Sequence, residues 1–136
     1  LVLGRDDFVD DARRWRQAAG GGMRQAGGIA AAGIVALDTM VDRLAEDHTN
    51  ARRLAAHLAE AGLILDFPPD EVETNIVFAE IPTRLMDAEE FVMGLSAEGV
   101  WVNPPRDRRI RLITHHNVSA DDIEAAGAIV RKVLGS

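Results

Sequence analysis

The stretch from Met23 to Leu37 constrains the fold most, because after Arg24 it carries no charged side chain and consists largely of Ala and Gly. A helix that is apolar on every side is usually buried, so we predict a buried helix here. From Asp38 the apolar residues are spaced alternately by three and four, which is typical of an amphipathic helix. This pattern ends at Gly62, a residue suited to the left-handed position after a helix. The change near Asp38 predicts a domain boundary.

Beyond Gly62 the chain alternates between short strand and helix patterns. The expected elements are a strand at 74–81, a short helix between Asp87 and Gly99, strands at 100–103 and 109–114, and a last helix that starts near Ser119. Asp87 and Glu90 have the spacing of a capping box, and Ser119 with Asp122 marks the start of the last helix. This order predicts a small α/β sandwich in which helices cover one face of a sheet.

A glycine triplet at 20–22 provides the first candidate binding site. Residues 1–4 resemble the end of a buried strand, and residues 5–18 have the spacing of a helix that the triplet ends. Glycine amides approach an anion closely, and Arg24 at the start of the following helix adds a bidentate donor. A hinge between two helices with an exposed arginine explains the pattern equally well, because neither the P-loop spacing nor the dinucleotide spacing is present.

Arg111 is the second candidate. Strand alternation places it on one face with Arg109 and Ile113, opposite the face that carries Ile110 and Leu112. Spacing alone favours a solvated arginine on the outer face of a strand. The functional alternative is a guanidinium that pairs with a substrate carboxylate at a domain cleft.

The histidines and the remaining arginines suggest structural or solvated roles. We expect His48 to be a hydrogen-bonded core residue, His57 to lie on the surface, and Arg106, Arg108 and Arg109 to form a solvated loop. His115 and His116 point to opposite faces if they extend a strand, and no coordinating set accompanies them, so no metal site is predicted.

Composition narrows the function further. The net charge of −7 argues against nucleic acid as a partner, and the absence of cysteine removes disulfides and thiolate chemistry. No apolar run approaches the roughly 20 residues that span a membrane, and no leader pattern opens the chain. We therefore expect a cytoplasmic protein. Lys132 is its one lysine, so amine chemistry from a side chain would have to use it.

Several motifs along the chain, taken in order, form one recognisable pattern. The most specific block is Gly20-Gly21-Gly22-Met23-Arg24-Gln25, preceded by Arg14-Trp15-Arg16. The further stretches are Ala30 to Gly33, Arg43 to His48 with Asn50-Ala51, Thr74 to Phe78, Gly99 to Asn103, and Arg111 to His115. In this order they resemble the threonine aldolases that depend on pyridoxal 5′-phosphate, and the whole chain is similar to the C-terminal part of such an enzyme.

The resemblance implies an α/β fold, namely the C-terminal portion of an aspartate-aminotransferase-type (fold type I) enzyme. Residues 1–37 would end the large cofactor-binding domain and residues 38–136 would form the small domain. Arg24 would lie near the phosphate of pyridoxal 5′-phosphate, partly across the subunit interface of a homo-oligomer, a dimer or tetramer. Arg111 would hold the α-carboxylate of a β-hydroxy-α-amino acid.

The implied reaction cleaves threonine or allo-threonine to glycine and acetaldehyde. The Schiff-base lysine of the family has no match in this chain, so we expect no catalytic residue here and no activity from the chain alone. Gln17 stands where the family commonly has Lys, and Asn117 where Asp is common. The alternatives are another fold-type-I lyase, or a non-enzymatic α/β module that binds a partner through residues 23–37.

Overall fold

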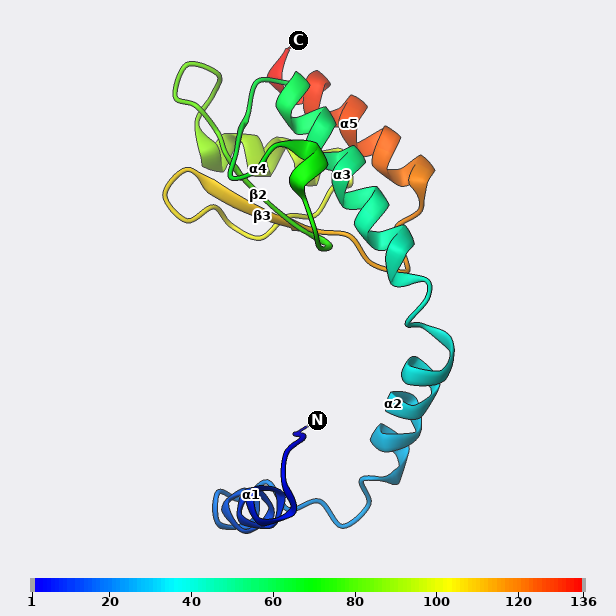
Figure 1. Cartoon of the computed structure of the whole chain (residues 1–136). Coiled ribbons are helices and arrows are strands. Elements are labelled where there is room, and N and C mark those ends of the chain that lie inside the picture. Colours follow the sequence, from blue (N-terminus) through cyan, green and yellow to red (C-terminus); the bar gives the residue numbers. More distant parts are fainter. Residues whose placement is uncertain (1, 136) are drawn as a thin grey trace. The chain divides into compact units, whose positions relative to one another are not determined.

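The computed structural model describes residues 2–135, and the chain divides into two units, residues 1–40 and 41–136 (Figure 1). The first unit holds helices α1 (Asp6–Ala18) and α2 (Gly27–Thr39). The first turn of α1 carries Asp6 and Asp7, whose charges suit the positive end of the helix dipole. The helix expected at 5–18 is therefore confirmed.

Two expectations for this unit are wrong. Residues 2–5 are irregular and Val2 and Leu3 are exposed, so the strand predicted at 1–4 does not form; Leu1 lies outside the described residues. A strand needs a neighbouring strand for its hydrogen bonds, and none of the described residues provides one.

The apolar helix α2 also differs from its prediction. It begins at Gly27, after a turn at 24–26, and none of its residues is buried within the described chain. Ile29 is 67% exposed and Leu37 63% exposed. The predicted burial requires a packing surface, and the residues of this unit do not supply one.

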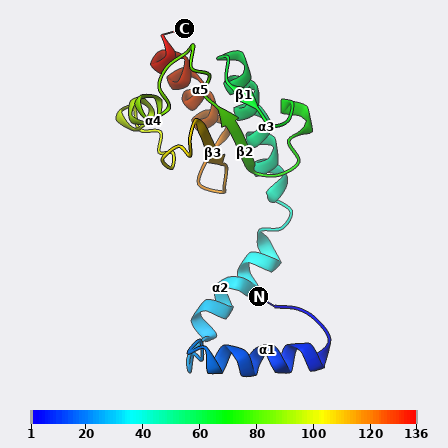
Figure 2. The same ribbon diagram turned by 90° about the vertical axis from the view of Figure 1, so that its left-hand side faces the viewer.

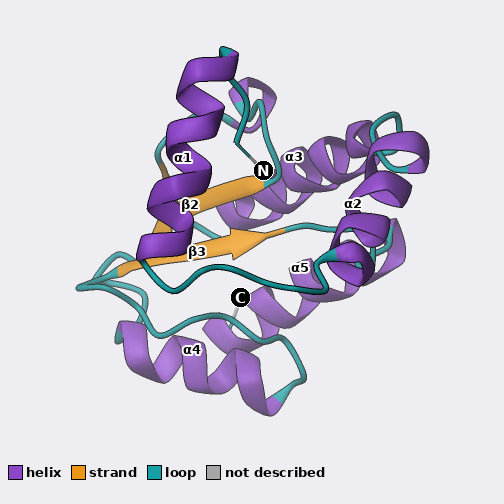
Figure 3. Cartoon of the chain, turned by 90° about the horizontal axis from the view of Figure 1, so that it is seen from below, coloured by secondary structure: helices purple, strands orange, loops and turns teal. Residues whose placement is uncertain are grey.

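The second unit is an antiparallel sheet with helices on one face. Its elements, in order, are α3 (Leu44–Glu60), β1 (Ile64–Leu65), the 3-10 turn η1 (Pro69–Glu71), β2 (Ile76–Glu80), α4 (Ala88–Ala97), β3 (Arg109–Ile113) and α5 (Ala120–Leu134). The strand order is β1-β2-β3, as Figure 2 shows. Helix α5 contacts both α3 and α4 (Figure 3).

Alternation along the strands gives the sheet a buried face and an open face. Val77 of β2 and Ile110 and Leu112 of β3 are buried against the helices, as predicted. Phe78 and Ile113 on the other face are 40% and 43% exposed. The expected α/β sandwich with helices on one face is confirmed.

The third strand of the sheet is not the predicted one. Residues 100–103 are irregular, while Ile64–Leu65 pairs with β2 through Ile64–Glu80 and Leu65–Ala79. The segment after α3 returns directly beside β2, so that edge is occupied by β1. Residues 100–103 run into Pro104 and Pro105, which have no N–H to donate to a ladder.

The predicted helix ends are accurate because they depend on local geometry. Asp87 caps α4 by accepting from the N–H groups of Glu89 and Glu90, and Ser119 and Asp122 form a capping box at α5. The Ser119 hydroxyl, followed by its N–H, donates to the Asp122 carboxylate and holds the pKa of that group below its ordinary value of 3.8. Gly62 takes the left-handed conformation, with φ of +88°.

The capping box predicts a defined dependence of stability on pH. A lowered carboxyl pKa stabilises the fold above the unfolded pKa, and the stabilisation is lost as pH falls through the folded pKa. The difference in free energy of unfolding between the wild type and Asp122→Asn should be largest above the ordinary carboxyl pKa of 3.8 and should shrink as pH falls below it. Urea unfolding across this range measures it, and a difference that persists at the acid end would contradict the assignment.

Candidate functional site

Arg111 lies in the middle of β3 on the open face of the sheet. It borders a groove of about 610 Å³ beside this strand, which is also lined by residues 98–103 and by residues 122–129 of α5. Polar side chains along the groove include Asn103, His115 and Asn117. Trp101, which is 85% exposed, stands on the same rim. The groove therefore combines a cationic group with hydrogen-bonding and aromatic side chains.

The guanidinium of Arg111 differs from its neighbours because it has no hydrogen-bond or ion-pair partner among the described residues. Arg109, on the same face, pairs with Asp66 and lies over the ring of Phe78 at 5.8 Å. The Phe78 Cα is directly across the ladder from Arg111. An exposed, unpaired guanidinium beside an apolar ring is suited to a small carboxylate ligand.

The arginine loop is solvated only in part: Arg106 is exposed, with no side-chain partner among the described residues, whereas Arg108 and Arg109 are bound. Nε of Arg108 donates to the carbonyl of Ile81 over 2.6 Å, and its Nη2 donates to the carbonyl of Met86. Arg108 thus ties the start of β3 to the segment that follows β2. Arg109 is held by Asp66, so these two arginines serve the structure.

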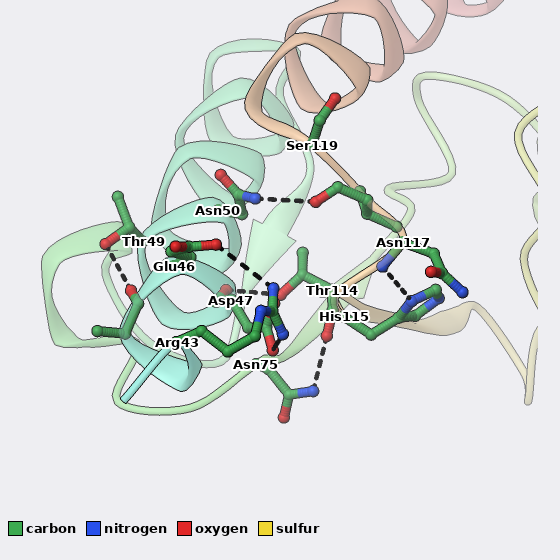
Figure 4. Close-up of polar contacts among 12 residues, drawn as sticks. Arg43, Glu46, Asp47, Thr49, Asn50, Asn75, Thr114, His115, Asn117 and Ser119 are labelled. Atoms are coloured by element: carbon green, nitrogen blue, oxygen red, sulfur yellow. Dashed lines mark hydrogen bonds and ion pairs between the residues drawn. The ribbon is translucent and has the colours of Figure 1, made fainter. Parts of the chain in front are cut away.

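Below the groove, a polar cluster joins the end of β3 to the start of α3 (Figure 4). The Thr114 hydroxyl donates to the carbonyl of Asp47 over 2.7 Å. The Thr114 N–H donates to the Asn75 carbonyl over 3.0 Å, and Asn75 Nδ2 donates back to the Thr114 carbonyl over 2.7 Å. Three segments that are distant in sequence therefore meet at Thr114, which is 1% exposed.

The first turns of α3 complete this cluster. Arg43 binds the Asp47 carboxylate in a bidentate pair, at 3.1 and 3.3 Å, while the Asp47 side chain is only 5% exposed. Asn50, also buried, donates to the carbonyl of Val118 over 3.1 Å and so reaches the segment before α5. These residues belong to the stretches that carry the family resemblance, but their polar contacts were not predicted.

One signal in the sequence could have identified part of this cluster. Alternation along β3 puts Thr114 on the inward face, where a hydroxyl needs a partner. The buried face of α3 includes Asp47, Asn50 and Leu54. Each of them lies one position before a residue that the three-and-four spacing predicts to be buried. A search for regularly spaced apolar residues misses the buried face of a helix where that face carries polar side chains, as it does in the first turns of α3.

Arg24 lies in the other unit, in the turn before α2, and not in the first turn as predicted. It is exposed and has no partner among the residues that the structure describes. The N-cap of α2 is Ala26, which offers no side-chain acceptor to the open N–H groups of the first turn. A free guanidinium next to open helix N–H groups is a donor set that fits a phosphate, as the expected cofactor requires.

The histidines depart from their predicted roles. His48 is half-buried and its ring makes no hydrogen bond within the described chain. His57 is not a surface residue: its side chain is 15% exposed and its Nε2 lies 3.0 Å from Glu124 Oε2 of α5. Residues 2–135 contain no group of three or more His, Asp or Glu side chains arranged to hold a metal ion. No helix in the same range is long and apolar enough to cross a membrane.

Comparison with known proteins gives a consistent result. The model of the β-eliminating lyase family matches residues 1–82. The probable low-specificity L-threonine aldolase 2 of Arabidopsis thaliana is 38% identical over 137 residues, 100% of this chain and 38% of its own length. The low specificity L-threonine aldolase of Escherichia coli is 37% identical over 98% of this chain and 38% of its own length. The chain thus spans well under half of these relatives.

Other similarities are more distant. The alanine racemase TOXG of Cochliobolus carbonum is 27% identical over 98% of this chain and 34% of its own length. Among solved structures, a chain of the SepCysS–SepCysE N-terminal domain complex aligns with a TM-score of 0.54 at 12% identity, over 70% of this chain and 27% of that one. The Plasmodium yoelii ornithine aminotransferase aligns with a TM-score of 0.50 at 14% identity, over 68% and 24%. The expected aminotransferase-type fold is confirmed.

The buried ion pair of the cluster generates a prediction. Removing Arg43 or Asp47 leaves a charged partner poorly solvated, so a double-mutant cycle of Arg43→Met and Asp47→Asn should give a coupling of about 1–2 kcal/mol. The matched control is the pair of Lys132 and Glu98, whose side chains are 66% and 36% exposed. This exposed pair should couple by less than about 1 kcal/mol. Urea unfolding of the wild type, the four single variants and the two double variants measures both couplings, and equal couplings would refute the difference.

Proposed function

Because the chain belongs to the β-eliminating lyase family, and its cofactor is accordingly pyridoxal 5′-phosphate, we propose that it is the C-terminal part of an aldolase that cleaves threonine or allo-threonine to glycine and acetaldehyde. Its role is to bind the substrate carboxylate and to complete the cofactor pocket. The observation that carries this proposal is the exposed, unpartnered guanidinium of Arg111 in a chain that matches L-threonine aldolases along its whole length.

Arg111 binds the α-carboxylate of the amino acid with two parallel N–H donors. This fork fixes the orientation of the substrate as well as its charge, because both carboxylate oxygens are held in the guanidinium plane. The open sheet face supports the role, since Arg111 is reached from solvent without any rearrangement of the core. Phe78, across the ladder, gives the site an apolar side wall.

Arg24 and the open start of α2 hold the phosphate of the cofactor. Two positive contributions act together there, the guanidinium and the N-terminal end of the helix dipole. In this proposal residues 1–37 end the large domain, residues 38–136 form the small domain, and the complete enzyme is a homo-oligomer. Gln17, in place of a lysine common in the family, leaves one cation fewer near this site.

In the proposed reaction, this chain binds the substrate and the cofactor stabilises the charge that forms on it. When bound, the cofactor provides an electron-accepting ring that stabilises the negative charge left on Cα as the Cα–Cβ bond breaks. Arg111 contributes by holding the carboxylate so that this bond stays aligned for cleavage. Within the described chain, no side chain combines the geometry and the chemistry of a Schiff-base lysine. The bond-breaking groups therefore belong to the rest of the enzyme.

A second candidate is a different reaction on an amino acid with the same carboxylate clamp. The similarity to an alanine racemase over 98% of the chain favours it, because a carboxylate clamp serves either reaction. Activity of the complete enzyme toward threonine and toward alanine separates the two candidates. Cleavage of threonine without racemisation of alanine supports the aldolase.

Loss of the fork in Arg111→Ala should lower kcat/KM for threonine in the complete enzyme by about 100- to 1,000-fold, the value of two hydrogen bonds between charged groups. Arg111→Lys keeps the charge without the fork and should lie in between. Arg109→Ala is the matched control, since it removes an arginine from the same face of the same strand. Steady-state kinetics with threonine test this, and an Arg111→Ala enzyme as efficient as Arg109→Ala would exclude Arg111 from the site.

Lys132 should not bind the cofactor covalently. Its Nζ lies 2.6 Å from Glu98 Oε2, and its side chain is 66% exposed, so its amine is engaged in an ion pair on the surface of α5. Borohydride treatment of this chain with pyridoxal phosphate, followed by peptide mass spectrometry, should therefore find no stoichiometric adduct at Lys132. A surface lysine of an unrelated protein, treated in the same way, is the control. Stoichiometric labelling of Lys132 above that control would show that Lys132 forms an imine with pyridoxal phosphate and would contradict this prediction.

A further inference from the structure

The proposed role of Arg111 depends on where β3 holds it, and on that basis we propose that Thr114 is a positioning residue for the substrate-binding arginine. Its hydroxyl and its backbone fasten the end of β3 to α3 and β2. Its side chain points away from the open face, so it acts through Arg111 and not by touching the substrate.

The first step concerns the strand itself. In the order β1-β2-β3, β3 is an edge strand and hydrogen-bonds to one neighbour, β2. The ends of such a strand open more easily than its centre, because each terminal bond lacks support from a second ladder. In a strand of five residues, Arg111 is only two residues from either end. Fraying at an end therefore reaches the arginine directly.

The second step concerns how the ends are closed. At the start of β3, Ile81 N–H donates to the Arg108 carbonyl over 2.9 Å, and Arg108 Nε donates to the Ile81 carbonyl. At the far end, Thr114 supplies three hydrogen bonds, two with Asn75 of the β2 side and one to Asp47 of α3. Of these three bonds, only the hydroxyl bond crosses from the sheet to a helix, so it fastens the strand end to α3 (Figure 4).

The third step concerns Arg111. Arg109 is held by its own side-chain contacts, the ion pair with Asp66 and the stacking on Phe78. Arg111 has no such contact with the described residues, so its backbone determines where the fork lies. A bidentate clamp tolerates little displacement, since a shift of about 1 Å can cost orders of magnitude in rate. Thr114, three residues further along, ties this backbone to α3 by a hydrogen bond.

The experiment compares Thr114→Val, Thr114→Ser and Thr49→Val in the complete enzyme that carries this chain. Valine keeps the shape of threonine and removes the hydroxyl, whereas serine retains it. Thr49→Val is the matched control: it too deletes a hydroxyl bond to a carbonyl of α3, that of Ala45 at 2.8 Å, but this bond stays inside the helix. The carbonyl of Asp47 keeps its own helical hydrogen bond in Thr114→Val, so the fold should survive.

We expect Thr114→Val to raise KM for threonine roughly 10-fold, because the displaced fork binds the carboxylate less well, and to lower kcat as well, because the same fork keeps the breaking bond aligned. Thr114→Ser and Thr49→Val should stay within about twofold of the wild type. Amide hydrogen exchange of residues 109–113 should be faster in Thr114→Val alone. An unchanged KM, or an equal rise in Thr49→Val, would overturn the positioning role.

Two further variants, measured in the same way, ensure that every outcome supports or contradicts the positioning role. If Thr114→Val does not fold, Asn75→Asp replaces it, since this change removes the amide donor to the Thr114 carbonyl at constant size and should also raise KM. Arg111→Ala, measured in parallel, separates the two proposals. If Arg111→Ala loses substrate capture while the Thr114 and Asn75 variants keep the normal KM, only the positioning inference fails. If Arg111→Ala has no effect, the proposed function of Arg111 fails, and the positioning role fails with it.

Discussion

The hydroxyl of Thr114 and the carbonyl of Asp47 join two segments 67 residues apart in sequence, and this bond fastens the end of β3 to the start of α3. With the end of β3 fixed to the first turn of α3, the inward residues of the strand reach the hydrophobic core. Ile110 is 2% exposed and Leu112 is 8% exposed. The polar junction is fully satisfied, because no buried side-chain nitrogen or oxygen in the described chain lacks a partner. A satisfied buried network specifies one arrangement of its elements, whereas apolar packing alone tolerates several.

The helices pack on only one face of the sheet, and the side chains that alternate outward along β2 and β3 stay more exposed. Three arginines in β3 or directly before it differ in their contacts. Arg108 binds backbone carbonyls and Arg109 binds Asp66, while Arg111 has no partner in the described structure. The proposed binding role thus falls to the one guanidinium of these three that the fold does not use.

Residues 1–40 present the opposite case. Helix α2 is built from apolar residues and yet buries none of them within the described chain. Surfaces of this kind are normally covered by another part of a protein or by a partner. The chain spans 38% of the length of its aldolase relatives, and in the proposed enzyme the remaining domain and a second subunit would provide this cover. The exposed start of the same helix, with Arg24, is then the part that faces the cofactor phosphate.

Local chemistry in the sequence was sufficient for much of this protein. Periodicity located α3, β2, β3 and α5, and the caps at Asp87 and Ser119 placed two helix starts, because these signals depend on residues only a few positions apart. The motif order also identified the family. Tertiary structure alone decided that β1, and not residues 100–103, is the third strand, that His57 pairs with Glu124, and that Thr114 binds α3. Each of these outcomes depends on which distant segments come together, and the free energy of such contacts is not encoded in any short stretch of the chain.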